Sequence, residues 1–234
     1  NSEAKMRPRD FANFVLTFCC VQLAAAQSLP PFTFAWLSDT HVGSTTGAAD
    51  LAATVRDINL LDSVAFVVLS GDITELGSDA EIAEAKAILE SLNKPFYIIP
   101  GNHDTKWSES GGTTFSRVFG ADRFVFGYGG FLFFGLHQGP LMRMGDGHFA
   151  PEDVRWLDSL LATVEPALPL FFITHYPLDD GIDNWFELTD RLRRFNTQAV
   201  LVGHGHSDRR MEFEGIPSAM GRKNRSEISS TASE

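Results

Sequence analysis

The stretch VAFVVLSGD, residues 64–72, decides the fold class. Its first part, Val64 to Leu69, is almost uninterruptedly apolar, which is the pattern of a strand buried on both faces of its sheet. Gly71 and Asp72 follow, so a turn and a carboxylate stand at the carboxyl end of that strand. Ligand sites of open α/β sheets lie at this end of the strands. The stretch therefore predicts a parallel sheet with a polar site at its carboxyl edge.

The same alternation of apolar and amphipathic stretches continues on both sides. A helix over 79–92 is predicted by apolar residues that recur on one face, and Ser78 is placed to cap it. Further strands are expected at 32–37, 95–99, 124–126, 131–136, 170–174 and 199–202, and further helices at 48–60, 151–161 and 185–195. The segment between 100 and 114 reads as a loop rich in Gly, Ser and Thr. This order predicts an α/β layered domain with a largely parallel central sheet.

Potential metal ligands follow five of the expected strands. They are Asp39 and His41, then Asp72, then Asn102, His103 and Asp104, then His175, and finally His204 and His206. Singly, each of these motifs is more often a turn or a satisfied polar residue. Together they hold five of the seven histidines, each beside another potential ligand. Carboxylate, imidazole and amide oxygen without thiolate suit Mn, Fe or Zn. A carboxylate can bridge two such ions about 3.5–4 Å apart, and the ions lower the pKa of a bridging water.

In their order and spacing, the five blocks resemble the calcineurin-like metallophosphoesterase family, from about Phe32 to about Gly221. The resemblance implies a layered α/β/β/α sandwich and two divalent ions, Mn, Fe or Zn. It assigns the first ion to Asp39, His41 and His206, and the second to Asn102, His175 and His204, with Asp72 bridging both. His103 matches the family's non-ligand histidine, which protonates the leaving group or stabilises the transition state. Asp104 would then orient His103.

Two departures from the family pattern carry information. Glu75 stands where the purple acid phosphatase branch has a tyrosine ligand, which argues against a tyrosinate–ferric centre. Only about 28 residues follow His206, whereas relatives usually have more strands there. Either the second sheet is short and incomplete, or the sequence is a piece of a longer protein.

The blocks around Asp72 and Asn102 resemble the phosphodiesterase branch, so hydrolysis of a phosphodiester by a metal-bridging hydroxide is expected. A phosphomonoesterase or phosphoprotein phosphatase on the same site, and a non-catalytic metal-binding module, remain alternatives. Arg143 and His148 lie in a glycine-rich segment that is expected to border the pocket, with Arg143 on phosphate and His148 near the metals; a solvated loop is the equal alternative. Trp107 and Trp185 could stack on a substrate base, although core packing is the more frequent role of such residues.

The net charge of −11, from 19 Lys and Arg against 30 Asp and Glu, argues against binding to a nucleic-acid duplex. A small phosphate ester or nucleotide remains possible as a substrate, because bound cations reverse the local charge. Twenty Phe against three Tyr predict apolar cores and pocket walls.

Residues 1–26 are expected to be a signal peptide, so the protein is expected to be exported, periplasmic or secreted. A basic start precedes an apolar run, too short for a stable membrane span, which ends in Ala24–Ala26. Met6 would make a start codon, so residues 1–5 would lie upstream of it. An ordinary amphipathic segment is the alternative. Residues 27–220 would form the metallophosphoesterase domain and 221–234 a polar tail without fixed structure.

Overall fold

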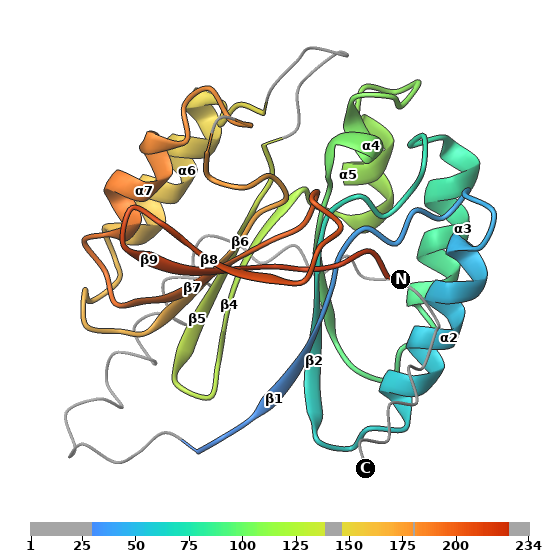
Figure 1. Ribbon diagram of the computed structural model, residues 1–234, viewed down its shortest axis with the longest axis horizontal. Helices are drawn as coiled ribbons and strands as arrows, with labels where there is room; N and C mark the ends of the chain where they lie inside the picture. Colours follow the sequence, from blue (N-terminus) through green and yellow to red (C-terminus); the bar gives the residue numbers. More distant parts are fainter. Residues whose placement is uncertain (1–29, 139–146, 180, 225–234) are drawn as a thin grey trace.

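A computed structural model describes residues 30–138, 147–179 and 181–224. Two β-sheets pack face to face, with α2 and α3 outside one sheet and α6 and α7 outside the other (Figure 1). This is the α/β/β/α sandwich that the resemblance implied. The predicted signal peptide, residues 1–26, lies outside the described residues.

The two sheets differ in size and in strand direction. The first contains three parallel strands, β1 (Thr33–Leu37), β2 (Val64–Ser70) and β3 (Phe96–Ile99). The second has the order β4-β5-β6-β7-β9-β8, formed by β4 (Arg123–Tyr128), β5 (Phe131–Leu136), β6 (Leu170–Ile173), β7 (Thr197–Val202), β8 (Arg209–Phe213) and β9 (Ile216–Met220). Its four middle strands are parallel, and the outermost strands, β4 and β8, are antiparallel to their neighbours. The predicted parallel pairing therefore holds for the whole first sheet and for the four middle strands of the second.

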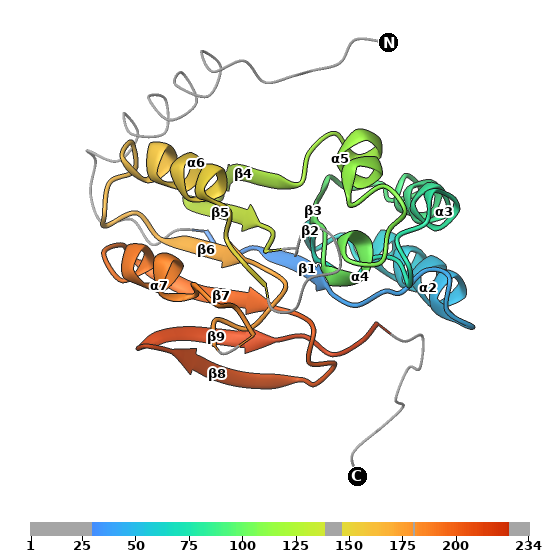
Figure 2. The same cartoon turned by 90° about the horizontal axis from the view of Figure 1, so that it is seen from above.

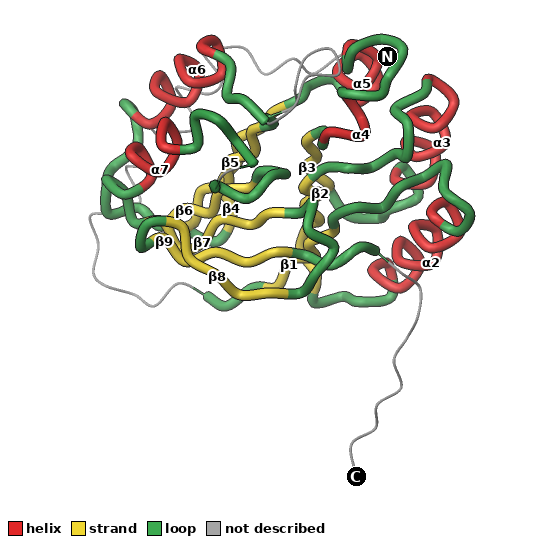
Figure 3. The backbone as a smooth tube through the Cα atoms, turned by 45° about the horizontal axis from the view of Figure 1, so that its top comes forward, coloured by secondary structure: helices red, strands yellow, loops and turns green. Residues whose placement is uncertain are grey.

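The helices lie outside the two strand layers (Figure 3). They are α2 (Gly47–Asn59), α3 (Asp79–Leu89), α4 (Asn102–Thr105), α5 (Thr113–Phe119), α6 (Pro151–Leu161) and α7 (Phe186–Leu192). Ser78 caps α3 as predicted: its Oγ accepts from the backbone N–H of Glu81 at 3.2 Å, and the Glu81 carboxylate accepts from the Ser78 N–H at 3.1 Å. The short helices α4 and α5 begin within the segment that was expected to be a loop.

Strands β8 and β9 are the elements that the sequence did not predict. They form a hairpin whose two-residue turn has positive φ at Glu214 (47°) and Gly215 (84°), as the tightest hairpin turns require. With this hairpin the second sheet has six strands, and two of them follow His206. After β9, the Gly221 N–H donates to the Val202 carbonyl at 2.9 Å, which ties the start of the following segment to β7.

Three separate hydrophobic clusters fill the spaces between the four layers. One lies between the first sheet and its helices, one between the second sheet and α6 and α7, and one between the two sheets. Strand β2 shows how one sequence serves two clusters: Val67 and Leu69 face the helices, whereas Phe66 and Val68 face the second sheet. Figure 2 shows these layers from above.

The cluster between the sheets is rich in phenylalanine, as the composition predicted. Across the two sheets, Phe66 and Phe34 of the first sheet meet Phe133 of the second edge to face, with ring centroids 5.1 and 5.4 Å apart. Rings at these separations gain energy beyond the burial of their area. This contact fixes the two sheets against each other, and so fixes the distance between the polar loops at their edges. In the described part of the chain, no helix is long and apolar enough to cross a membrane.

Candidate metal centre

All seven predicted metal ligands follow parallel strands of the two sheets. Asp39 and His41 follow β1, Asp72 follows β2, Asn102 follows β3, His175 follows β6, and His204 and His206 follow β7. Backbone hydrogen bonds continue past the strand ends: the Asp39 N–H donates to the Gly71 carbonyl at 3.0 Å, and the Gly203 N–H donates to the His175 carbonyl at 2.9 Å. The ligand loops are therefore tied to one another and do not hang freely from the sheets.

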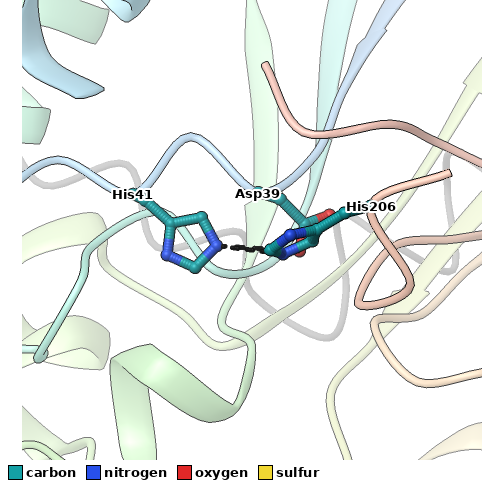
Figure 4. Close-up of side chains that lie close together, drawn as sticks. All are labelled: Asp39, His41 and His206. Carbon is teal, nitrogen blue, oxygen red and sulfur yellow. Dashed lines mark hydrogen bonds and ion pairs between the residues drawn. The ribbon is translucent and has the colours of Figure 1, made fainter. Parts of the chain in front are cut away.

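Asp39, His41 and His206, here called the first ligand group, offer ligand atoms that lie within 4.8 Å of one another (Figure 4). The Nε2 atoms of the two histidines are 3.3 Å apart, and Oδ1 of Asp39 lies 3.1 Å from Nε2 of His206. Asp39 is fully buried and His41 nearly so, whereas the His206 side chain is 45% exposed. The group is thus open to solvent on the His206 side only.

Asp72, His175 and His204 form a second such group, here called the second ligand group. The side-chain oxygen of Asn102 joins it, at 3.1 Å from Nε2 of His175 and 3.0 Å from Nδ1 of His204. Nδ1 of His175 lies 2.9 Å from the Ser70 carbonyl, which leaves Nε2 directed at the other members. A second hydrogen bond of this kind is what usually orients a metal-bound histidine.

Asp72 lies between the two ligand groups. Its Oδ2 is 3.2 Å from Nε2 of His175 in the second group and 3.9 Å from Nε2 of His41 in the first. Its Oδ1 accepts from the backbone N–H of His103 at 2.9 Å, which holds the carboxylate in place. Of the seven predicted ligands, Asp72 therefore has the position that a bridging carboxylate needs.

The backbone at the ligands is strained. Among the described residues, six other than glycine have a positive φ, and five of them are predicted ligands: Asp39, His41, Asp72, His204 and His206. Left-handed backbone costs a side-chain-bearing residue roughly 1–2 kcal/mol. Strain of this kind persists where the surrounding structure imposes it, and it clusters at functional sites.

Two glycines allow the ligand loops to approach each other closely. A Cβ atom on Gly203 would lie 2.0 Å from Oγ of Ser38 and 2.8 Å from Oδ2 of Asp39. A Cβ atom on Gly101 would lie 2.3 Å from Oδ1 of Asp72. Neither glycine has a positive φ, so their role is close approach of the backbone to the ligands and not a left-handed turn.

His103 lies beside the first ligand group, with its ring centroid 4.7 Å from that of His41. Its Nδ1 is 2.5 Å from the backbone carbonyl of Glu75, which orients the ring. Glu75 also reaches His41: its Oε2 lies 3.0 Å from Nδ1 of His41, without the alignment of a regular hydrogen bond. One residue thus contacts both a predicted ligand and the predicted acid, a role that sequence reasoning missed.

Asp104 has a different role from the expected one. It was expected to orient His103, but its fully buried carboxylate accepts hydrogen bonds from the backbone N–H groups of Ile73, Thr74 and Gly101, and from the Thr74 hydroxyl. Burial and the nearby charge of Asp72 raise the pKa of Asp104 to about 6, although these hydrogen bonds oppose the shift. Asp104 therefore ties the loop after β2 to the loop after β3, and positions Asp72 and His103 through the backbone.

Electrostatics at the centre favour a cation. Burial alone would raise the pKa of Asp39 and of Asp72. The hydrogen bond with His206 and the charge of His175 lower the pKa of Asp39, and the charge and hydrogen bond of His175 lower the pKa of Asp72. Burial alone would lower the pKa of His175, but Asp72 raises it to about 9. Burial lowers the pKa of His41, where positive charges on His103 and Lys223 act in the same direction and carboxylates oppose them. Buried carboxylates that stay ionised require positive charge nearby.

The donor set fits divalent metal ions. Buried carboxylates and imidazoles converge without thiolate, which suits borderline ions. Burial also lowers the pKa of His204, which favours the neutral imidazole that binds metal. The residues present can therefore hold metal at both ligand groups.

Of the remaining predicted site residues, those that the structure describes do not join the two ligand groups. Arg143 lies outside the described residues. The half-exposed His148 has its Nδ1 2.7 Å from Oδ1 of Asp183. Trp185 packs against the core of the second sheet, and Trp107 is 44% exposed with the Lys106 ammonium 5.3 Å from its ring.

Two further supporting residues were missed from the sequence. The Ser38 hydroxyl donates to Oδ2 of Asp39 at 2.5 Å, which turns Oδ1 toward His206. Buried Gln138 accepts the backbone N–H of His175 on its side-chain oxygen at 3.0 Å. The serine directly before a ligand was a weak local signal, whereas nothing local marks Gln138.

The α/β/β/α layers and the two His/Asp groups at their carboxyl edge define the class of metal-dependent hydrolases. Residues 32–208 match the calcineurin-like phosphoesterase family, and the chain belongs to that family. It is a hydrolase that acts on phosphate esters.

Relatives and solved structures agree with this placement. The chain is 27% identical over 212 residues, 73% of its length and 70% of the relative's, to the probable glycerophosphodiester phosphodiesterase GpdQ of Arcobacter nitrofigilis. It is 26% identical over 201 residues to GpdQ of Enterobacter lignolyticus, covering 74% of this chain and 70% of the relative. The fold is similar to that of phosphopantetheinyl hydrolase from Mycobacterium tuberculosis, with a TM-score of 0.55, 16% identity, and 84% and 92% of the two chains covered.

Proposed function

We propose that the chain hydrolyses a phosphodiester with two divalent metal ions. The observation that carries this proposal is the position of Asp72, whose Oδ2 faces histidines of both ligand groups. The first ion would be held by Asp39, His41 and His206, and the second by Asn102, His175 and His204, with Asp72 shared. When bound, the ions would supply the positive charge that makes water nucleophilic near neutral pH and holds the phosphoryl oxygens.

His103 would act on the leaving group. Its Nδ1 is directed at the Glu75 carbonyl, so it would donate a proton or a hydrogen bond from Nε2. The carbonyl fixes the tautomer with the proton on Nδ1 whenever the ring is neutral. A donation from Nε2 therefore requires the doubly protonated ring.

The preference for a diester is supported by the relatives named as glycerophosphodiester phosphodiesterases, and by the motif around Asp72 and Asn102. The substrates that these names give belong to the relatives. At 26–27% identity, the names support a type of reaction for this chain, hydrolysis of a phosphodiester, and not a particular substrate. Mn, Fe and Zn all suit the donor set.

The test is a comparison of two chromogenic substrates. Purified protein is depleted of metal, reloaded with Mn²⁺, Fe²⁺ or Zn²⁺, and assayed with bis(p-nitrophenyl) phosphate and p-nitrophenyl phosphate. Metal-dependent turnover with a higher kcat/KM for the diester supports the proposal. A higher kcat/KM for the monoester would favour a phosphomonoesterase, and turnover that survives complete metal removal would exclude the metal mechanism.

We also propose that the protein is exported. The basic and apolar pattern of residues 1–26 supports this, with cleavage after Ala26. Expression of the full chain in a bacterial host, followed by N-terminal sequencing of periplasmic material, tests it. A mature end at Gln27 is expected, and an uncleaved end on cytoplasmic protein would contradict export.

A further inference from the structure

A cavity of about 670 Å³ lies beside the first ligand group. His206 lines it, so the cavity reaches the predicted metal ligand that is open to solvent. Trp36 and Met220 contribute apolar surface to the wall. Arg222 and Lys223 contribute positive charge, and Asp208 contributes one negative charge. Nothing in the sequence pattern indicates this cavity, because its basic residues fall in the segment that reads as a polar tail.

The segment that carries the two basic residues is held at both ends. Ahead of them, the Gly221 N–H donates to the Val202 carbonyl at 2.9 Å, at the edge of the second sheet. After them, the Asn224 N–H donates to the Ser38 carbonyl at 3.3 Å, at the edge of the first sheet. The segment therefore crosses between the sheets next to the metal centre, and presents its side chains there.

The positive charges in this wall are weakly compensated by the protein. Arg222 has only a 3.9 Å contact with Asp208, and both of these side chains are more than 70% exposed. An exposed ion pair of this kind contributes little to the free energy of unfolding, so Arg222 can pair with a ligand in place of Asp208. Lys223 is half-buried, and among the described residues it has no carboxylate partner within 4.0 Å. A partly buried cation without a partner favours an anionic ligand.

The wall is also suited to an organic group. The Trp36 indole N–H donates to the Ser70 hydroxyl at 2.9 Å, which fixes the ring orientation. An aromatic ring held in this way presents apolar area without losing conformational freedom on binding. The cavity thus combines a fixed apolar surface with two cations and lies next to the place where the phosphate ester would bind.

We propose that this cavity binds the alcohol portion of a phosphodiester substrate, and that this portion carries a second anionic group. The inference rests on the proposed function and narrows its substrate class. Trp36 and Met220 would contact the carbon atoms of the alcohol, and Arg222 and Lys223 would pair with its carboxylate or second phosphate. The phosphodiester group itself would remain at the two ligand groups.

Two diesters of the same shape test the proposal. p-Nitrophenyl 2-carboxyethyl phosphate and p-nitrophenyl propyl phosphate share the leaving group and differ only in a carboxylate in place of a methyl group. The Mn²⁺-loaded protein is expected to prefer the carboxylate by about tenfold in kcat/KM, mainly through KM, which corresponds to about 1.4 kcal/mol. The double variant Arg222→Gln/Lys223→Gln is expected to lose this preference.

A matched control is the double variant Arg209→Gln/Arg210→Gln on β8, which removes the same charge from exposed residues that do not line the cavity. It is expected to keep the preference. Because the readout is a ratio for one protein, partial misfolding of a variant does not imitate the result. Equal kcat/KM for the two diesters in the unmodified protein, or a preference that survives in Arg222→Gln/Lys223→Gln, would overturn this inference alone. Failure to cleave either diester would overturn the proposed function as well.

Discussion

Replacement of Glu75 by alanine is expected to weaken metal binding at the first ligand group. Nε2 of His41 faces Asp39 and His206, so an ion held there leaves the proton on Nδ1. The Glu75 carboxylate lies 3.0 Å from that Nδ1 and would accept the proton, which fixes the ring orientation. Among the described residues, no other hydrogen-bond partner reaches this nitrogen.

The expected loss of metal affinity follows from the contact between the Glu75 carboxylate and Nδ1 of His41. A hydrogen bond to a charged group contributes about 1.5–3 kcal/mol net when it is well formed. The Glu75 side chain is 36% exposed and its contact with His41 is poorly aligned, so the lower end of this range applies. Because 1.4 kcal/mol corresponds to a factor of ten, the Kd of one ion should rise by about tenfold.

Isothermal titration of the metal-free protein with Mn²⁺ measures this Kd. Glu75→Gln keeps an acceptor oxygen without the charge and should fall between the wild type and Glu75→Ala. Asp79→Ala is the control, because it removes the same charge from an exposed residue nearby whose contact is with Arg117. Unchanged affinity in Glu75→Ala would refute the reasoning, and an equal loss in Asp79→Ala would show that net charge and not the contact is responsible.

Three further predictions concern the proposed acid and the scaffold. His103→Ala should retain bound metal by elemental analysis and lose about 10²–10⁴-fold in kcat, the usual contribution of a general acid; full activity would remove His103 from the mechanism. Ser78→Ala should lower the free energy of unfolding by about 1 kcal/mol in denaturant titration, because it removes the cap of α3, whereas Ser91→Ala at an exposed site should change it by less than about 0.5 kcal/mol. Phe133→Ala should cost about 3–5 kcal/mol, because the side chain is fully buried between the sheets; the exposed Phe186→Ala is its control, and equal losses would contradict this account of the core.

The positions of the ligand loops could be predicted because they depend on local pattern. An apolar run such as Val64 to Leu69 fixes a buried strand, and parallel strands place their carboxyl ends at one edge. Asp72 and His175 are 103 residues apart in number, yet each directly follows such a strand. Nε2 of His175 and Oδ2 of Asp72 lie 3.2 Å apart, and this follows from the strand order more than from any feature of the intervening chain.

The hairpin of β8 and β9 was missed because its pattern is not that of a buried strand. Arg209 and Arg210 begin β8, which lies at the edge of the sheet, where charged residues guard against pairing with other chains. Its turn uses Glu214 and Gly215, and a glutamate at positive φ is an uncommon turn signal.

The roles of Glu75 and Asp104 could not be read from the sequence either. Both depend on the path of the loop after β2, which brings the Glu75 carbonyl to His103 and the Ile73 and Thr74 N–H groups to Asp104. Each of these contacts joins a side chain to a backbone atom, so the pattern of side-chain types does not reveal the partner. The cavity at Arg222 and Lys223 was hidden for a related reason, since its walls come from both sheets.

The most direct test of the two-metal account is elemental analysis of the wild-type protein and of Asp72→Ala after loading with Mn²⁺ and removal of free metal. The account predicts two ions per chain in the wild type, and loss of both in the variant, because the Asp72 carboxylate faces both ligand groups. Circular dichroism shows whether the variant remains folded. A folded Asp72→Ala protein that still holds two ions would contradict the bridging role of Asp72 and, with it, the proposed centre.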